Sequence, residues 1–108
     1  EDLEKIKADN KTIISFHMPP DKLGMDVCYT RDQNVYKYVG SKSIYNWIEK
    51  EQPLISLHGH IHESYDITKT WNFNLGRTLV VQPGQMQLTR FVVLELNGEK
   101  VIPCLKFL

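Results

Sequence analysis

The stretch Leu54-Ile55-Ser56-Leu57-His58-Gly59-His60-Ile61-His62-Glu63 sets the expected fold and chemistry of this 108-residue chain. A short apolar run stops at Gly59, and histidines follow it two residues apart. In an extended backbone residues i and i+2 point the same way, so His60 and His62 are predicted to converge on one metal ion or on two neighbouring ions. Gly59 has no Cβ where the chain must bend sharply or admit a ligand. Because imidazole is a common ligand of zinc, iron and copper, the stretch is predicted to form half of a metal site.

Another histidine follows another predicted strand. Residues 12–16, Thr-Ile-Ile-Ser-Phe, are rich in β-branched and aromatic side chains and predict a buried strand. His17 comes directly after it, and Pro19 and Pro20 then prevent further ladder bonding and stiffen the exit. A side chain held this rigidly loses little conformational freedom when it binds a metal ion, so His17 is a candidate metal ligand.

The rest of the chain predicts an α/β fold with a mixed sheet covered by helices. In such sheets ligands gather beyond the carboxyl ends of strands, where His17, His60 and Gln82-Pro83-Gly84 are all expected. Before the histidine stretch, the sequence predicts the end of a helix in residues 1–9, a long loop in 21–40, and a helix from about 44 to 50. Ser41 or Ser43 is expected to cap that helix, and Gln52-Pro53 to stop it. After the histidine stretch, it predicts two short strands or a ribbon in 64–74, a turn at Gly76-Arg77, a strand in 78–82, and a hairpin of strands 89–96 and 100–107 that turns at Asn97-Gly98.

The composition predicts one ordinary globular domain covering residues 1–108. Thirteen basic residues balance 13 acidic ones, which leaves no electrostatic footprint for nucleic acid or an anionic membrane. No apolar run is long enough to span a bilayer. The charged first residues are not those of a signal peptide, and the missing initiator methionine suggests a fragment or a processed product. Cys28 and Cys104 follow no metal or redox spacing and are predicted to be reduced thiols of a cytoplasmic protein.

Three motifs together resemble the calcineurin-like metallophosphoesterase superfamily. They are His17-Met18-Pro19-Pro20, Gly59-His60-Ile61-His62 and Val81-Gln82-Pro83-Gly84-Gln85, which are similar to the family's His-x-Pro-Pro, Gly-His-x-His and Asn-Pro-Gly-Ser segments. The resemblance covers roughly residues 12 to 96 and implies the carboxyl-terminal half of that domain, without its amino-terminal half. The implied fold is a mixed β-sheet sandwich flanked by helices, half of a four-layer αββα arrangement.

The family's site holds two divalent metal ions, Mn, Fe or Zn, bridged by an Asp and a hydroxide. The resemblance implies that His17 and His60 bind the second ion and that His62 binds the first. It implies metal-dependent hydrolysis of phosphomonoesters or phosphodiesters by the two-metal-activated hydroxide, with a phosphoester as partner and homo-oligomerisation left open. The family's Asp-x-His, Gly-Asp and Gly-Asn-His motifs are absent, so no catalytic or substrate-binding residue is assigned in this chain, and the chain alone is expected to be weakly metallated or inert.

Two alternatives to the enzyme remain open. One is a non-catalytic protein-interaction module with a metallophosphoesterase fold, like the retromer scaffold subunit that resembles this family. The other is a free-standing domain that holds one ion through three histidines, which is chemically competent but would expose an unpaired sheet edge. The three intact histidines favour the enzyme, because a scaffold has no need to keep them.

Other side chains near the motifs are given structural roles. His58 is predicted to lie in the core or behind the ligands, and Glu63 to be solvated or to lie behind the ligands, not to bind the metal itself. Asp26, Asp66 and backbone carbonyls are the candidates to accept a hydrogen bond from the other ring nitrogen of a ligating histidine, and the sequence does not choose between them. Gln82-Pro83-Gly84 is predicted to close the floor of the site. Packing is also the preferred role of the large aromatic side chains: Tyr29, Tyr36, Tyr38, Trp47, Trp71 and Phe73.

Overall fold

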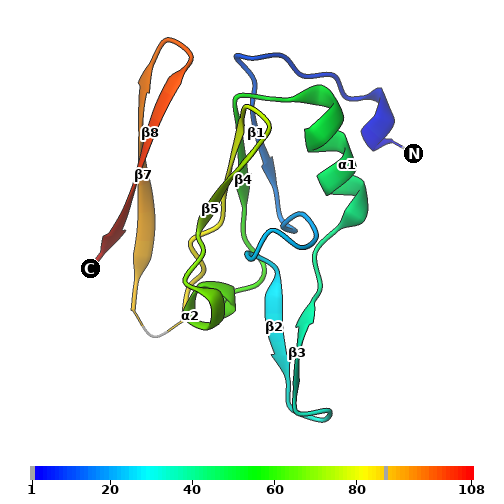
Figure 1. Ribbon diagram of the computed structural model, residues 1–108. Coiled ribbons are helices and arrows are strands. Elements are labelled where there is room, and N and C mark those ends of the chain that lie inside the picture. The colour runs from blue at the N-terminus through cyan, green and yellow to red at the C-terminus, as the bar shows by residue number, and fades with distance from the viewer. Residues whose placement is uncertain (1, 87) are drawn as a thin grey trace.

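A four-stranded mixed sheet lies at the centre of the structure, a computed structural model that describes residues 2–86 and 88–108 (Figure 1). Adjacent strands β1 and β4 pair in parallel, as do β4 and β6, whereas β5 pairs with β6 antiparallel. The predicted mixed α/β architecture is thus confirmed, and the carboxyl ends of three neighbouring strands meet at one edge of the sheet. In sheet order the strands are β1 (Ile13–Phe16), β4 (Ile55–His58), β6 (Thr78–Val81) and β5 (Asn72–Leu75).

Helix α1 (Lys42–Glu51) packs on one face of this sheet (Figure 1). Ser41 is its N-cap, and the Oγ atom accepts a hydrogen bond from the Ile44 backbone N–H at 3.2 Å. Gln52 ends the helix in the left-handed conformation, so the predicted stop is confirmed, and of the two candidate caps Ser41 is the one used, which starts the helix two residues earlier than predicted. Trp47 and Ile48 enter the core from this helix, because they lie on its apolar face. The other buried members of that core are Leu23, Met25, Leu75 and Val80.

Residues 21–40, predicted to be a long loop, instead contain a β-hairpin. Strands β2 (Val27–Thr30) and β3 (Val35–Tyr38) pair antiparallel, with Tyr29 opposite Tyr36. The prediction was wrong because β3 is exposed along its whole length, so no buried apolar face reveals it in the sequence. The β propensity of valine and tyrosine, together with the cross-strand tyrosine pair, favours the hairpin.

Residues 64–74, predicted to be strands only, begin with a short helix. Helix α2 (Ser64–Thr68) is held by contacts with the first residue of β2 and with the chain just before that strand. The Ser64 Oγ accepts from the Val27 backbone N–H at 3.0 Å, and the Thr68 Oγ1 donates to the Gly24 carbonyl at 2.6 Å. These tertiary contacts outweigh the alternating pattern, and only β5 remains of the predicted ribbon. The predicted helix end in residues 1–9 is likewise reduced to one 3-10 turn, η1 (Leu3–Lys5).

A long hairpin of β7 (Arg90–Asn97) and β8 (Lys100–Phe107) lies beside the sheet on the side away from α1 (Figure 1). The predicted hairpin is confirmed, although its two turn residues are Gly98 and Glu99 rather than Asn97 and Gly98. Gly98 has φ +64°, which the first position of a tight type II′ turn requires. The predicted turn at Gly76-Arg77 joins β5 to β6, as expected.

The hairpin has one half-buried face and one exposed face. On the first, Val101 and Pro103 line a small cavity together with Leu79 of the central sheet. On the second, Phe91 and Ile102 are 41% and 45% exposed, so part of this layer presents apolar surface to solvent. Throughout the described ranges no helix is both long and apolar enough to cross a membrane.

Candidate metal centre

The candidate site lies at the edge where β1, β4 and β6 end. His17 follows β1, His60 follows β4 by two residues, and Gln82-Pro83-Gly84 follows β6. Because these strands are parallel neighbours, all three segments lie at the same edge, as the sequence predicted. The Gly59 backbone N–H donates to the His17 carbonyl at 3.1 Å, which extends the β1–β4 ladder into the site.

His17 and His60 face each other across this edge. The Nε2 atom of His17 lies 2.9 Å from the Nδ1 atom of His60, and the ring planes meet at 64°. Both side chains are exposed. Two nitrogen ligands about 2.05 Å from one ion lie about 2.9 Å apart at a right angle and about 3.3 Å apart at the tetrahedral angle. The observed separation therefore fits two nitrogens that share one ion, and it also fits a direct N–H···N hydrogen bond.

The backbone at His60 is not extended, so the alternation argument for His60 and His62 was wrong. Strand β4 ends at His58, and His60 has φ +68°. The Ile61 N–H donates to the Gly59 carbonyl at 2.8 Å, which closes a γ-turn around His60. A left-handed conformation is unfavourable for a residue with a Cβ, and strain of this kind gathers at functional sites.

His62 follows this turn with an exposed side chain, and its role as a metal ligand stays a prediction. Across residues 2–86 and 88–108 there is no cluster of three or more His, Cys, Asp or Glu side chains that could hold a metal ion. What the structure brings together is therefore a pair of imidazoles, His17 and His60. Such a pair supplies two neutral nitrogen donors and leaves the remaining coordination positions to other groups.

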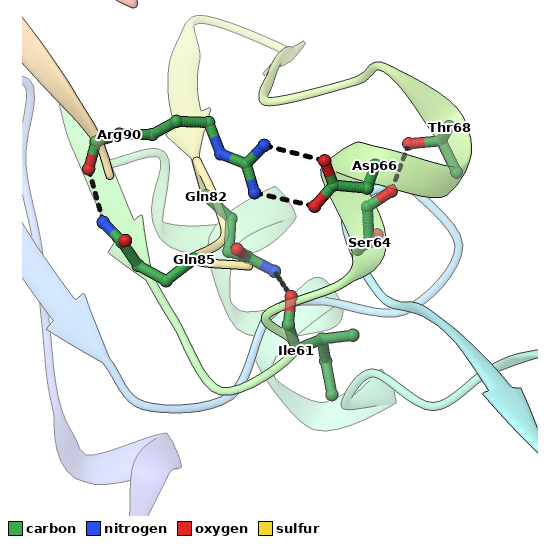
Figure 2. A network of polar contacts seen from close by, with 7 residues as sticks. All are labelled: Ile61, Ser64, Asp66, Thr68, Gln82, Gln85 and Arg90. Atoms are coloured by element: carbon green, nitrogen blue, oxygen red, sulfur yellow. Dashed lines mark hydrogen bonds and ion pairs between the residues drawn. The ribbon is translucent and has the colours of Figure 1, made fainter. Parts of the chain in front are cut away.

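The segment after β6 is hydrogen-bonded to the backbone of residues 61 and 62, at the end of the γ-turn around His60, which is called the histidine turn below (Figure 2). The Gln82 Nε2 donates to the Ile61 carbonyl at 3.0 Å and to the Met25 carbonyl at 2.6 Å. The Gln85 N–H donates to the His62 carbonyl at 3.0 Å. Gly84 passes so close that a Cβ there would lie 2.6 Å from the same carbonyl oxygen. These contacts agree with the predicted role of Gln82-Pro83-Gly84 as the floor of the site.

His58 lies behind the pair and is buried, as predicted. Its Nδ1 atom is 2.7 Å from the Met18 carbonyl, its Nε2 atom is 2.6 Å from the Ser56 Oγ, and its ring stacks on that of Phe16 at 5.9 Å. Burial lowers the pKa of His58 to about 4, against the opposing effect of the bond to Met18. His58 is therefore neutral at pH 7, and both its ring nitrogens are already engaged.

Neither predicted carboxylate acceptor bonds to a candidate ligand. The Asp26 Oδ2 accepts from the backbone N–H groups of Lys22 and Gly40, and burial raises the Asp26 pKa despite those bonds. Asp66 is bound by Arg90 at 2.8 Å (Figure 2), and those hydrogen bonds hold the pKa of Asp66 below its usual value. Asp26 thus closes the loop before α1, and Asp66 anchors β7. Arg90 was missed in the sequence, where nothing local connects it to Asp66.

Comparison with known proteins finds no matching family model and no significant match among curated proteins or solved structures.

Proposed function

We propose that this chain supplies histidine ligands to the two-metal centre of a phosphoesterase of the calcineurin-like class. One observation carries the proposal: the His17 Nε2 and the His60 Nδ1 meet at 2.9 Å beyond the carboxyl ends of parallel strands. Mixed-sheet α/β proteins bind ligands at this edge. The finer fold in the proposal is half of a four-layer αββα sandwich, to which α1, the central sheet and the β7–β8 hairpin would contribute three successive layers.

The residues of this chain fit the task of holding divalent ions. His17 and His60 offer neutral nitrogen donors, and His62 would offer a third to the neighbouring ion. Pro19 and Pro20 are fully buried and keep the His17 loop rigid, so little ordering is needed on binding. When bound, two divalent ions of Mn, Fe or Zn would supply a nucleophilic water at neutral pH and neutralise the phosphoryl oxygens of a phosphomonoester or phosphodiester. The bridging carboxylate and the asparagine ligand have no counterpart in these 108 residues, so the proposal requires another polypeptide segment to supply them.

The test is a substitution of His60 in the full-length protein. His60→Ala should abolish metal-dependent hydrolysis of an aryl phosphomonoester and an aryl phosphodiester and should lower the bound metal measured by elemental analysis. Arg77→Ala is the control, because Arg77 is exposed at the opposite end of β6 and should change neither quantity. Unchanged hydrolysis in His60→Ala would contradict the proposal.

A non-catalytic interaction module is the second candidate, and the exposed apolar face of β7–β8 favours it. Phe91, Val93 and Ile102 are 41%, 47% and 45% exposed on the same hairpin face. Apolar surface of this kind often marks a protein-binding site. A full-length protein purified without tightly bound Mn, Fe or Zn, and inactive on both phosphoesters when these ions are added, would favour the module over the enzyme.

A further inference from the structure

We propose that His58 is the positioning residue of the histidine pair: it holds the backbone around His17 so that the His17 imidazole meets that of His60. The inference rests on the proposed function, in which this pair shares an ion. His58 itself is 8% exposed and lies beneath the site, so it would touch neither the ion nor the substrate. Its effect would pass through the chain segment that carries His17.

The hydrogen bonds of His58 require one tautomer. A carbonyl oxygen only accepts, so the 2.7 Å contact with Met18 places a proton on the His58 Nδ1. The Nε2 atom of the neutral ring is then an acceptor, and the Ser56 hydroxyl donates to it at 2.6 Å. Ser56 is fully buried, so this bond is shielded from water. The Met18 carbonyl therefore fixes the tautomer of His58, and the Ser56 hydroxyl holds the ring by its other nitrogen.

Three successive residues around His17 are bound by this arrangement. The Phe16 ring stacks on the His58 ring with an angle of 12° between the planes. The His17 carbonyl accepts from the Gly59 N–H, and the Met18 carbonyl accepts from His58. The chain before, at and after His17 is thus tied to the end of β4, which is also the strand that leads to His60. One buried side chain therefore couples the two ligands through a rigid backbone instead of through solvent.

The test compares variants of the full-length protein in two measurements. The first is the imidazole region of long-range 1H–15N NMR spectra of the metal-free protein, which reports whether the His17 Nε2 and the His60 Nδ1 share a proton. The second is a Co2+ titration followed by visible absorption. His58→Phe keeps the aromatic stack and removes both hydrogen bonds, whereas His58→Asn can still donate to the Met18 carbonyl. Ser56→Ala keeps the His58 side chain and removes only the hydrogen bond to its Nε2 atom, which helps to hold the ring against the Met18 carbonyl.

Thr78→Val is the matched control for Ser56→Ala. Thr78 is also fully buried, and its Oγ1 donates one hydrogen bond, to the Pro53 carbonyl at 2.6 Å, at the opposite end of the sheet. A loss of stability alone would affect both variants similarly. Only a positioning role predicts that the imidazole signals change in Ser56→Ala and stay the same in Thr78→Val.

In His58→Phe the signals of His17 and His60 should become those of independent, exposed imidazoles, and Co2+ affinity should fall about 10- to 100-fold. His58→Asn should keep part of the wild-type NMR signals of His17 and His60 and part of the wild-type Co2+ affinity. Wild-type NMR signals in His58→Phe, or equal changes in Thr78→Val, would overturn the inference. If His58→Phe does not fold, unchanged signals in Ser56→Ala overturn it instead. A wild-type protein that neither binds Co2+ nor hydrolyses phosphoesters would defeat the proposed function, while the metal-free spectra would still decide the role of His58.

Discussion

Arg90 donates two hydrogen bonds to the carboxylate of Asp66, at 2.9 Å from Nη1 and 2.8 Å from Nη2 (Figure 2). Arg90 is only 3% exposed, and its guanidinium lies 4.7 Å from the centre of the Tyr65 ring. Bidentate, charge-assisted bonds of this kind are among the stronger polar contacts in proteins. The pair joins the start of β7 to α2, which directly follows the histidine turn.

Replacing Arg90 should weaken the attachment of the β7–β8 hairpin. Arg90→Met removes both bonds to Asp66, and we expect the free energy of unfolding to fall by about 2 kcal/mol in urea denaturation at pH 7. The loss should not be larger, because Asp66 is partly exposed and water can replace the guanidinium. Lys37→Met, on the exposed strand β3, serves as control and should change stability by less than about 0.5 kcal/mol. Equal urea midpoints for the two variants would argue against the anchoring role.

Acid should destabilise the protein through His58. In the unfolded chain His58 titrates near pH 6.5, whereas in the folded protein its pKa is about 4. Between these values the unfolded state binds more protons, so stability falls as the pH drops from 6.5 toward 4. The largest loss from this group is about 3 kcal/mol. Urea midpoints measured from pH 7 to pH 4 should show this slope.

The control for the acid effect is His58→Asn, which has no titrating group at this position. Its pH dependence in the same range should be flatter than that of the wild type. Asp66 does not confound the comparison, because hydrogen bonds from Arg90 lower its pKa, and its contribution is lost only as the pH falls below about 3.8. A slope that is unchanged in His58→Asn would show that another group is responsible.

Strand β4 and helix α1 could be predicted because each combines a buried pattern with a local stop signal. Strand β4 is an apolar run ended by Gly59, and α1 has Ser41 as its cap and Gln52 at its end. The hairpin β2–β3 and the helix α2 were missed for opposite reasons. The first is exposed and has no buried face to reveal it, and the second is a single turn held by contacts with residues about 40 positions away, such as that of Ser64 with Gly24.

The candidate site likewise has one part that could be predicted from the sequence and one part that could not. The meeting of His17 and His60 was predictable, because parallel neighbours bring their carboxyl ends together. The γ-turn at His60 was not, because nothing within the motif itself requires a positive φ there. That conformation is held by Gln82 and by the close passage of Gly84, which lie more than 20 residues later in the chain. The sequence thus indicates which residues meet, while their backbone geometry depends on contacts from a distant segment.

Gly84 should be intolerant of any side chain. It has φ +71°, and an added Cβ would lie 2.6 Å from the backbone oxygen of His62. Gly98 is the matched control, because it has φ +64° and nothing within 4 Å of an added Cβ. We expect Gly98→Ala to cost about 1 kcal/mol, from the left-handed backbone alone, and Gly84→Ala about 3 kcal/mol because the clash is added. Thermal melts of the two variants should therefore differ by several degrees, and equal melting temperatures would mean that the floor of the site can move aside.

The strain at His60 can be separated from its role as a ligand. His60→Ala and His60→Gly both remove the imidazole and its contact with His17, but only glycine adopts φ +68° without a steric penalty. Left-handed backbone costs roughly 1–2 kcal/mol at a residue with a Cβ, and the greater freedom of glycine in the unfolded chain offsets part of this. We therefore expect His60→Gly to be more stable than His60→Ala by about 1 kcal/mol in urea denaturation, with metal binding lost in both. If His60→Ala were the more stable variant, the turn would relax without the imidazole, and the left-handed conformation would be a consequence of the His17–His60 contact instead of a feature imposed by Gln82 and Gly84.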